Sequence, residues 1–90
     1  MNKQTVASYV LRALAEAQIE GRVMSLSTLV SEIQVRKVDV RGVVTSLHRE
    51  GYLDVLRMRL TLRGFAVGRA LMEETLKNLR PRKLVLVKAA

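Results

Sequence analysis

Apolar residues recur every three to four positions along three segments of this chain, which is the period of an amphipathic helix. The first segment is 5–20, with the stripe Val6, Val10, Leu11, Leu14 and Ile19. The second is 25–34, with Leu29, Val30 and Ile33, and the third is 37–50, with Val40, Val43, Val44 and Leu47. The pattern therefore predicts three helices that each turn one face towards a common core.

Residues typical of helix ends bound these segments. Gly21 and Gly51 follow the first and third, where glycine readily adopts the left-handed conformation of a C-cap. Ser25 or Ser27 lies at the start of the second and can accept hydrogen bonds from the free N–H groups of its first turn. We expect the third helix to depend on packing, because its valines are mediocre helix formers.

The apolar period shortens to two residues after Gly51, which is typical of half-buried strands. Leu56, Met58, Leu60 and Leu62 alternate with Arg57, Arg59, Thr61 and Arg63. We predict strands over 52–56 and 58–62 with a tight turn between them, and Thr61 can cap a fourth helix over 62–79. The apolar stripe of that helix is Phe65, Met72, Leu76 and Leu79, and residues 83–88 predict a final strand or extended arm.

The predicted fold is mainly helical with a small β-hairpin (α+β), in the order helix, helix, helix, hairpin, helix. This is the order of a winged helix-turn-helix. At 90 residues the chain fits one domain, which we place at 1–80, followed by a basic and apolar C-terminal arm at 81–90. Hydrophobic residues make up 49% of the chain and aromatics only 3%, so aliphatic side chains must form the core.

Positive charge is concentrated in the later part of the chain. The formal net charge is +8, distributed as zero over residues 1–35, +5 over 36–69 and +3 over 70–90. Most of the basic residues are arginines, whose planar guanidinium pairs well with phosphate. This asymmetry predicts one basic face and a polyanionic partner, with general solubility as the alternative.

Particular sequence steps resemble those of winged-helix transcriptional regulators of the multiple-antibiotic-resistance regulator (MarR-type) superfamily. They are the helix-turn entry Leu29-Val30-Ser31-Glu32-Ile33-Gln34-Val35, the step Gly51-Tyr52-Leu53 and the segment Arg59-Leu60-Thr61-Leu62-Arg63-Gly64. The resemblance covers residues 5–79 and implies sequence-specific binding of double-stranded DNA by a dimeric repressor. The long dimerisation helices of full-size relatives have no counterpart here, so the resemblance carries over no effector pocket.

The resemblance implies that the third helix enters the major groove and that its first turns meet base edges. With the valine stripe inward, the positions outside the stripe are Lys37, Val38, Arg41, Gly42, Thr45, Ser46 and Arg49. Arg41 could pair with guanine and Val38 could touch a thymine methyl, while Arg36 and Arg49 would reach phosphate. Gly42 either lets a backbone or phosphate approach the helix closely or has no functional role. Asp39 has three possible roles: it compensates the helix dipole, it orients Arg36, or it accepts a hydrogen bond from the amino group of a cytosine.

Arginines also cluster on the predicted hairpin. Arg57, Arg59 and Arg63 would form a cationic edge on one strand face, and Arg57 and Arg59 are the candidates for flanking phosphates or the minor groove. The alternative is that these charges protect an edge strand from aggregation.

Little in the sequence points to an enzyme. There is no cysteine and no glycine-rich phosphate loop, and Glu73 and Glu74 are adjacent on a helix, where they diverge. His48 is the only histidine and has no metal-ligand spacing to other residues, so we expect a surface or boundary residue. We therefore expect no catalytic residues, cofactor or metal, no membrane segment, and a cytoplasmic, nucleoid-associated location.

Residues 84–87 are all apolar, so both faces of a strand formed by them would have to be buried against other parts of a protein. We expect a homodimer formed by the fourth helix and the C-terminal arm, through Phe65, Met72, Leu76, Leu84 and Leu86; alternatively the arm folds back on its own domain. Two other functions stay open: a protein-interaction module, and sequence-tolerant binding of DNA or RNA, against which the scarcity of aromatic residues argues.

Overall fold

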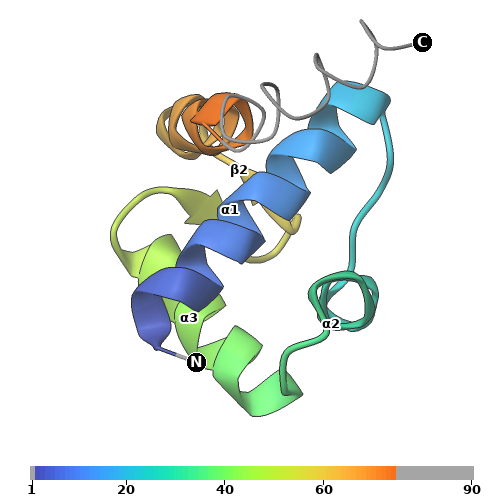
Figure 1. Cartoon of the computed structure of the whole chain (residues 1–90), viewed down its shortest axis with the longest axis vertical. Coiled ribbons are helices and arrows are strands. Elements are labelled where there is room, and N and C mark those ends of the chain that lie inside the picture. Colours follow the sequence, from blue (N-terminus) through green and yellow to red (C-terminus); the bar gives the residue numbers. More distant parts are fainter. Residues whose placement is uncertain (1, 75–90) are drawn as a thin grey trace, which may run out of the picture.

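The computed structural model describes residues 2–74, which begin with three helices packed against one another. They are α1 (Lys3–Glu20), α2 (Leu26–Ile33) and α3 (Lys37–Arg49). The long α1 crosses in front of α3 and contacts both other helices (Figure 1). The predicted helices are thus confirmed, with small shifts at their ends.

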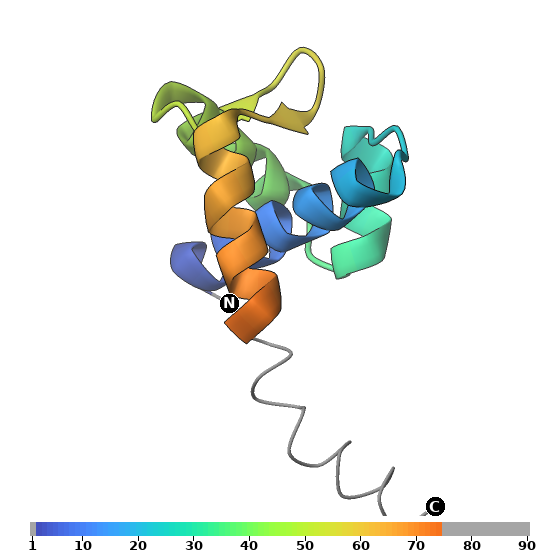
Figure 2. The same cartoon turned by 90° about the horizontal axis from the view of Figure 1, so that it is seen from above.

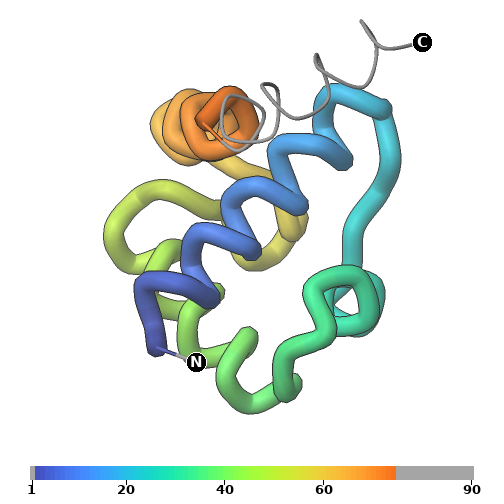
Figure 3. The backbone as a smooth tube through the Cα atoms, viewed as in Figure 1, coloured from blue at the N-terminus to red at the C-terminus, as the bar shows by residue number. Residues whose placement is uncertain are grey.

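Local hydrogen bonds fix the ends of α1 and α2. Asn2 caps α1 through the Thr5 N–H, and Gly21 ends it at φ 72°. An extended stretch then leads to α2 (Figure 3), where Ser25, rather than Ser27, accepts from the Thr28 N–H. The Arg22 guanidinium bonds Glu20 and lies 3.1 Å from Glu32 on α2, and these two hydrogen bonds raise the pKa of Arg22. The start of α2 is therefore tied to the end of α1.

The β-hairpin is much shorter than predicted. Strand β1 (Leu53–Asp54) pairs antiparallel with β2 (Arg59–Leu60), and residues 55–58 form the turn, which projects beyond the helices in Figure 2. The predicted two-residue alternation holds only from Arg57 to Leu60, where Met58 packs against the core between the exposed Arg57 and Arg59, although Met58 itself is left-handed at φ 49°. Leu60 is buried, whereas Leu56 and Leu62 are almost fully exposed.

A further helix begins at residue 62 and continues to the last described residue, 74. Thr61 caps it as predicted, since its Oγ1 accepts from the Gly64 N–H at 3.2 Å. This C-terminal helix lies on the other side of α1 from α2 (Figures 1 and 2). A Cβ on Gly68 would lie only 2.7 Å from the Leu11 carbonyl oxygen on α1, so the lack of a side chain allows this close packing.

Aliphatic side chains from α1, α2, α3 and the hairpin form one core. Its fully buried members include Val10, Leu14, Leu29, Val40 and Leu53. Ile19, expected in the α1 stripe, is instead half exposed in the last turn of the helix. The mainly helical architecture with one small antiparallel hairpin is confirmed. Among the described residues, no helix combines the length and apolar character needed to cross a bilayer.

Phe65 and Met72, both expected in a dimer contact, are partly buried against the core of their own chain. Leu76, Leu84 and Leu86 lie outside the described residues, as do the end of the fourth helix and the arm at 81–90. The homodimer stays a prediction.

Candidate nucleic-acid interface

Helices α2 and α3 are joined by a three-residue turn, residues 34–36. Gln34 adopts the left-handed conformation at φ 54°, and its N–H donates to the Val30 carbonyl at 2.9 Å. Val35 is buried and Ile33 packs partly against the core, so the chain is attached to the core on both sides of Gln34. A short turn of this kind fixes the direction in which α3 leaves α2.

One face of α3 is buried and the opposite face is open to solvent. Val40, Val43, Val44 and Leu47 are at most 6% exposed, as the apolar spacing predicts. Of the positions expected outside this stripe, Ser46 is half-buried and six are exposed: Lys37, Val38, Arg41, Gly42, Thr45 and Arg49. Four of these exposed residues are spaced four positions apart and form a stripe about 18 Å long, at a rise of 1.5 Å per residue: Lys37, Arg41, Thr45 and Arg49. The structure therefore brings the predicted residues of α3 together.

The start of α3 carries an ion pair. Arg36 precedes the helix, and its Nε donates to Asp39 Oδ2 at 3.1 Å. The Arg36 side chain remains 80% exposed. Asp39 lies in the first turn of α3 and orients Arg36, two of the roles considered for it. In this arrangement Asp39 offsets the charge that Arg36 would offer to a phosphate.

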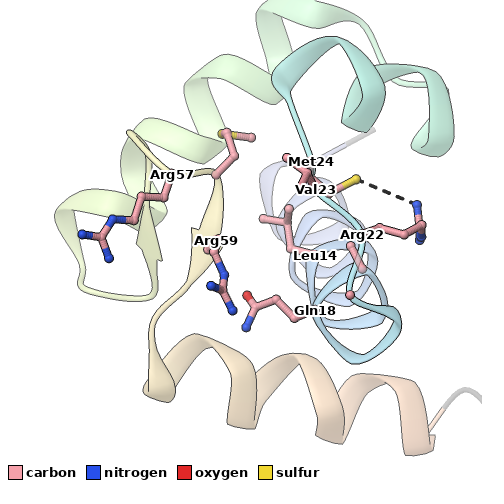
Figure 4. Close-up of a pocket in the computed structure, with 10 residues that line it drawn as sticks. Leu14, Gln18, Arg22, Val23, Met24, Arg57 and Arg59 are labelled. Atoms are coloured by element: carbon pink, nitrogen blue, oxygen red, sulfur yellow. Dashed lines mark hydrogen bonds between the residues drawn. The ribbon is translucent and has the colours of Figure 1, made fainter.

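The hairpin arginines do not share one strand face, so that expectation was wrong. Arg57 belongs to the turn and Arg59 to β2, and their side chains diverge (Figure 4). Arg57 Nε lies 3.7 Å from Asp54 Oδ2. Arg63 is in the first turn of the C-terminal helix, with its guanidinium 4.6 Å from the centre of the Tyr52 ring. The left-handed Met58 separates Arg57 from Arg59.

Two contacts that the sequence did not reveal hold the hairpin on the helices. His48, exposed as expected, places Nδ1 3.0 Å from the Leu53 carbonyl oxygen. Gln18 on α1 accepts a hydrogen bond from the Leu60 N–H through Oε1, at 2.6 Å. Gln18 stands on a helix far away in sequence, so no local pattern could identify it. These contacts fix the hairpin beside α1 and α3.

Residues 2–74 contain no group of three or more His, Asp or Glu side chains able to hold a metal ion. His48 contacts backbone atoms of the hairpin. The exposed cationic groups of α3 and the hairpin are the chemical feature that stands out.

The chain matches no family model, no curated protein and no solved structure.

Proposed function

We propose that this protein is a sequence-specific, double-stranded DNA-binding transcriptional regulator. Helix α3 enters the major groove, and Arg57 and Arg59 of the hairpin reach flanking phosphates or the minor groove. The fold is then a winged helix-turn-helix. Dimeric binding as a repressor belongs to the same proposal, with half-sites about 34–36 Å apart on a palindromic operator.

The proposal rests on one observation: α3 has one face buried in the core and an opposite face that is exposed and basic. Its inward face belongs to the core, while Lys37, Arg41 and Arg49 stand on a face that no other described element covers. A helix of this width fits the major groove of B-form DNA. Arginine and lysine suit guanine O6 and N7 as well as phosphate, so this face can combine base contacts with charge neutralisation.

Gly42 and Thr45 add to this fit. A Cβ placed on Gly42 would meet nothing within 4 Å, so neither the fold nor the packing requires glycine there. Glycine lets a base edge or phosphate approach the helix backbone closely. Thr45 and Val38 offer methyl groups to thymine.

Selection of bound fragments from random duplex DNA, followed by sequencing, tests the proposal. We expect an enriched motif, and fluorescence anisotropy should show tighter binding of that motif than of a shuffled duplex. The logarithm of the binding constant should fall with the logarithm of salt concentration, by about 0.9 for each phosphate neutralised. No enriched motif combined with equal binding of random RNA and DNA would indicate sequence-tolerant binding, and no binding would refute a nucleic-acid function.

A further inference from the structure

A cavity of about 190 Å³ lies between the end of α1, residues 21–24 and the hairpin turn (Figure 4). Its apolar lining includes Leu14, Ala17, Met24 and Met58. Leu14, Ala17 and Met24 belong to the core, and Met58 packs against it. One wall of the cavity is thus the hairpin that the proposed function places on DNA.

The polar end of this cavity is formed by Arg59 and Gln18. Figure 4 shows the Arg59 side chain directed towards the Gln18 amide. Gln18 Oε1 is already used by the Leu60 N–H, which leaves the Nε2 hydrogens to donate to another acceptor. Two donors of different kinds therefore lie at the same end of a cavity that is lined by both apolar and polar side chains.

The charge of Arg59 is not compensated within the described residues. Arg22, which also lines the cavity, is paired with Glu20 and Glu32. Arg57 is paired with Asp54 and its side chain leads away from the cavity (Figure 4). Arg59 makes no ion pair within residues 2–74, so it supplies a net positive charge to this end.

We propose that this cavity binds a small organic monocarboxylate. Its carboxylate accepts from the Arg59 guanidinium and the Gln18 Nε2 group, and its apolar tail lies along Leu14, Met24 and Met58. A cavity of about 150 Å³ holds a benzene molecule, so about 190 Å³ admits a tail of roughly five or six carbons. The two methionines can adapt to the shape of the tail.

The site itself does not depend on DNA binding, but its regulatory consequence rests on the proposed function. Arg59 would serve both the ligand and a DNA phosphate, and one guanidinium cannot pair fully with both. A bound carboxylate therefore lowers the affinity for DNA by removing one positive charge from the hairpin.

The test is a titration of the full chain, labelled with ¹³C at the methionine methyl groups, with hexanoate in the absence of DNA. We expect saturable shifts of the Met24 and Met58 signals, and none of similar size with acetate or hexylammonium. Arg59→Gln should weaken hexanoate binding at least tenfold, and Arg59→Lys less. The matched control Arg69→Gln, which removes an exposed arginine from the C-terminal helix, should leave binding unchanged.

Absence of saturation, equal binding of hexylammonium, or unchanged binding to Arg59→Gln would each overturn the site. Methyl spectra without ligand check that the variants are folded. Anisotropy with duplex DNA then tests the coupling, since hexanoate should weaken DNA binding by the unaltered chain and not by Arg59→Gln. If the chain fails to bind DNA but the titration succeeds, the carboxylate site stands and the proposed function falls.

Discussion

The backbone carbonyl of Tyr52 occupies the space in which a Cβ on Gly64 would have to lie. The same carbonyl accepts the Thr61 N–H at 3.1 Å, and Thr61 Oγ1 donates to the Gly51 carbonyl at 2.7 Å. The chain just after α3 is thereby joined to the first turn of the C-terminal helix. These contacts give a physical reason for threonine at position 61 and glycine at position 64.

Replacing Gly64 or Gly68 with alanine should destabilise the fold. The new methyl at 64 would overlap Tyr52 backbone atoms, and the one at 68 would lie 2.8 Å from the Ala15 Cβ. Since backbone must move in both cases, we expect losses of about 1–3 kcal/mol, with Gly64→Ala the larger. Urea denaturation measures this as a lower midpoint. A Gly64→Ala protein as stable as the unaltered chain would contradict the described packing.

Replacing Thr61 with alanine should cost about 1–2 kcal/mol, because it removes both the helix cap and the bond to Gly51. Thr61→Ser retains the hydroxyl and is the matched control. Thermal melting of both variants checks the prediction. Equal losses in the two would show that the methyl group, rather than the hydroxyl, holds this junction.

The sequence predicted the helices well because their apolar spacing directly reflects one shared core. On α3, burial of Val40 and Val43 forces Arg41 and Thr45 outward, so their exposure followed from the period alone, whereas their proposed role came from the resemblance. The hairpin was harder to predict. Its geometry depends on the left-handed Met58, a conformation uncommon for residues other than glycine, and on the distant Gln18. Neither leaves a pattern in the neighbouring residues.

Gly42→Ala should separate stability from DNA binding. The position is helical and open, so alanine should stabilise the protein by about 0.5–1 kcal/mol. The methyl group would lie beside Val38 and Thr45 on the proposed DNA face, and we expect weaker binding to the selected duplex. Urea denaturation and anisotropy measure the two effects. If affinity is unchanged while stability rises, the glycine has no part in DNA contact.

Arg41→Ala and Arg57→Ala should weaken binding in different ways. We expect Arg41→Ala to cost about 1–3 kcal/mol on the selected duplex and to relax the preference at one base pair. Arg57→Ala should weaken selected and shuffled duplexes alike and reduce the salt slope by about one. Arg69→Ala, on the C-terminal helix, is the control. Equal losses on both duplexes for Arg41→Ala would mean that Arg41 contacts only phosphate.

Asp39→Asn should strengthen DNA binding although it weakens α3 itself. It releases Arg36 from its ion pair and removes a negative charge next to the proposed DNA face. We expect a salt slope steeper by about 0.9, corresponding to one more phosphate neutralised. Loss of the favourable charge in the first turn should lower stability by about 0.3–1 kcal/mol.

Anisotropy over a salt series, with selected and shuffled duplexes, measures the effect of Asp39→Asn. Glu73→Gln is the matched control, because it releases Arg69 from a similar pair on the C-terminal helix and should change neither duplex. Weaker binding of the selected duplex alone would instead mean that Asp39 accepts a hydrogen bond from a cytosine amino group. In that case the carboxylate would contact a base, and its role in orienting Arg36 would be secondary.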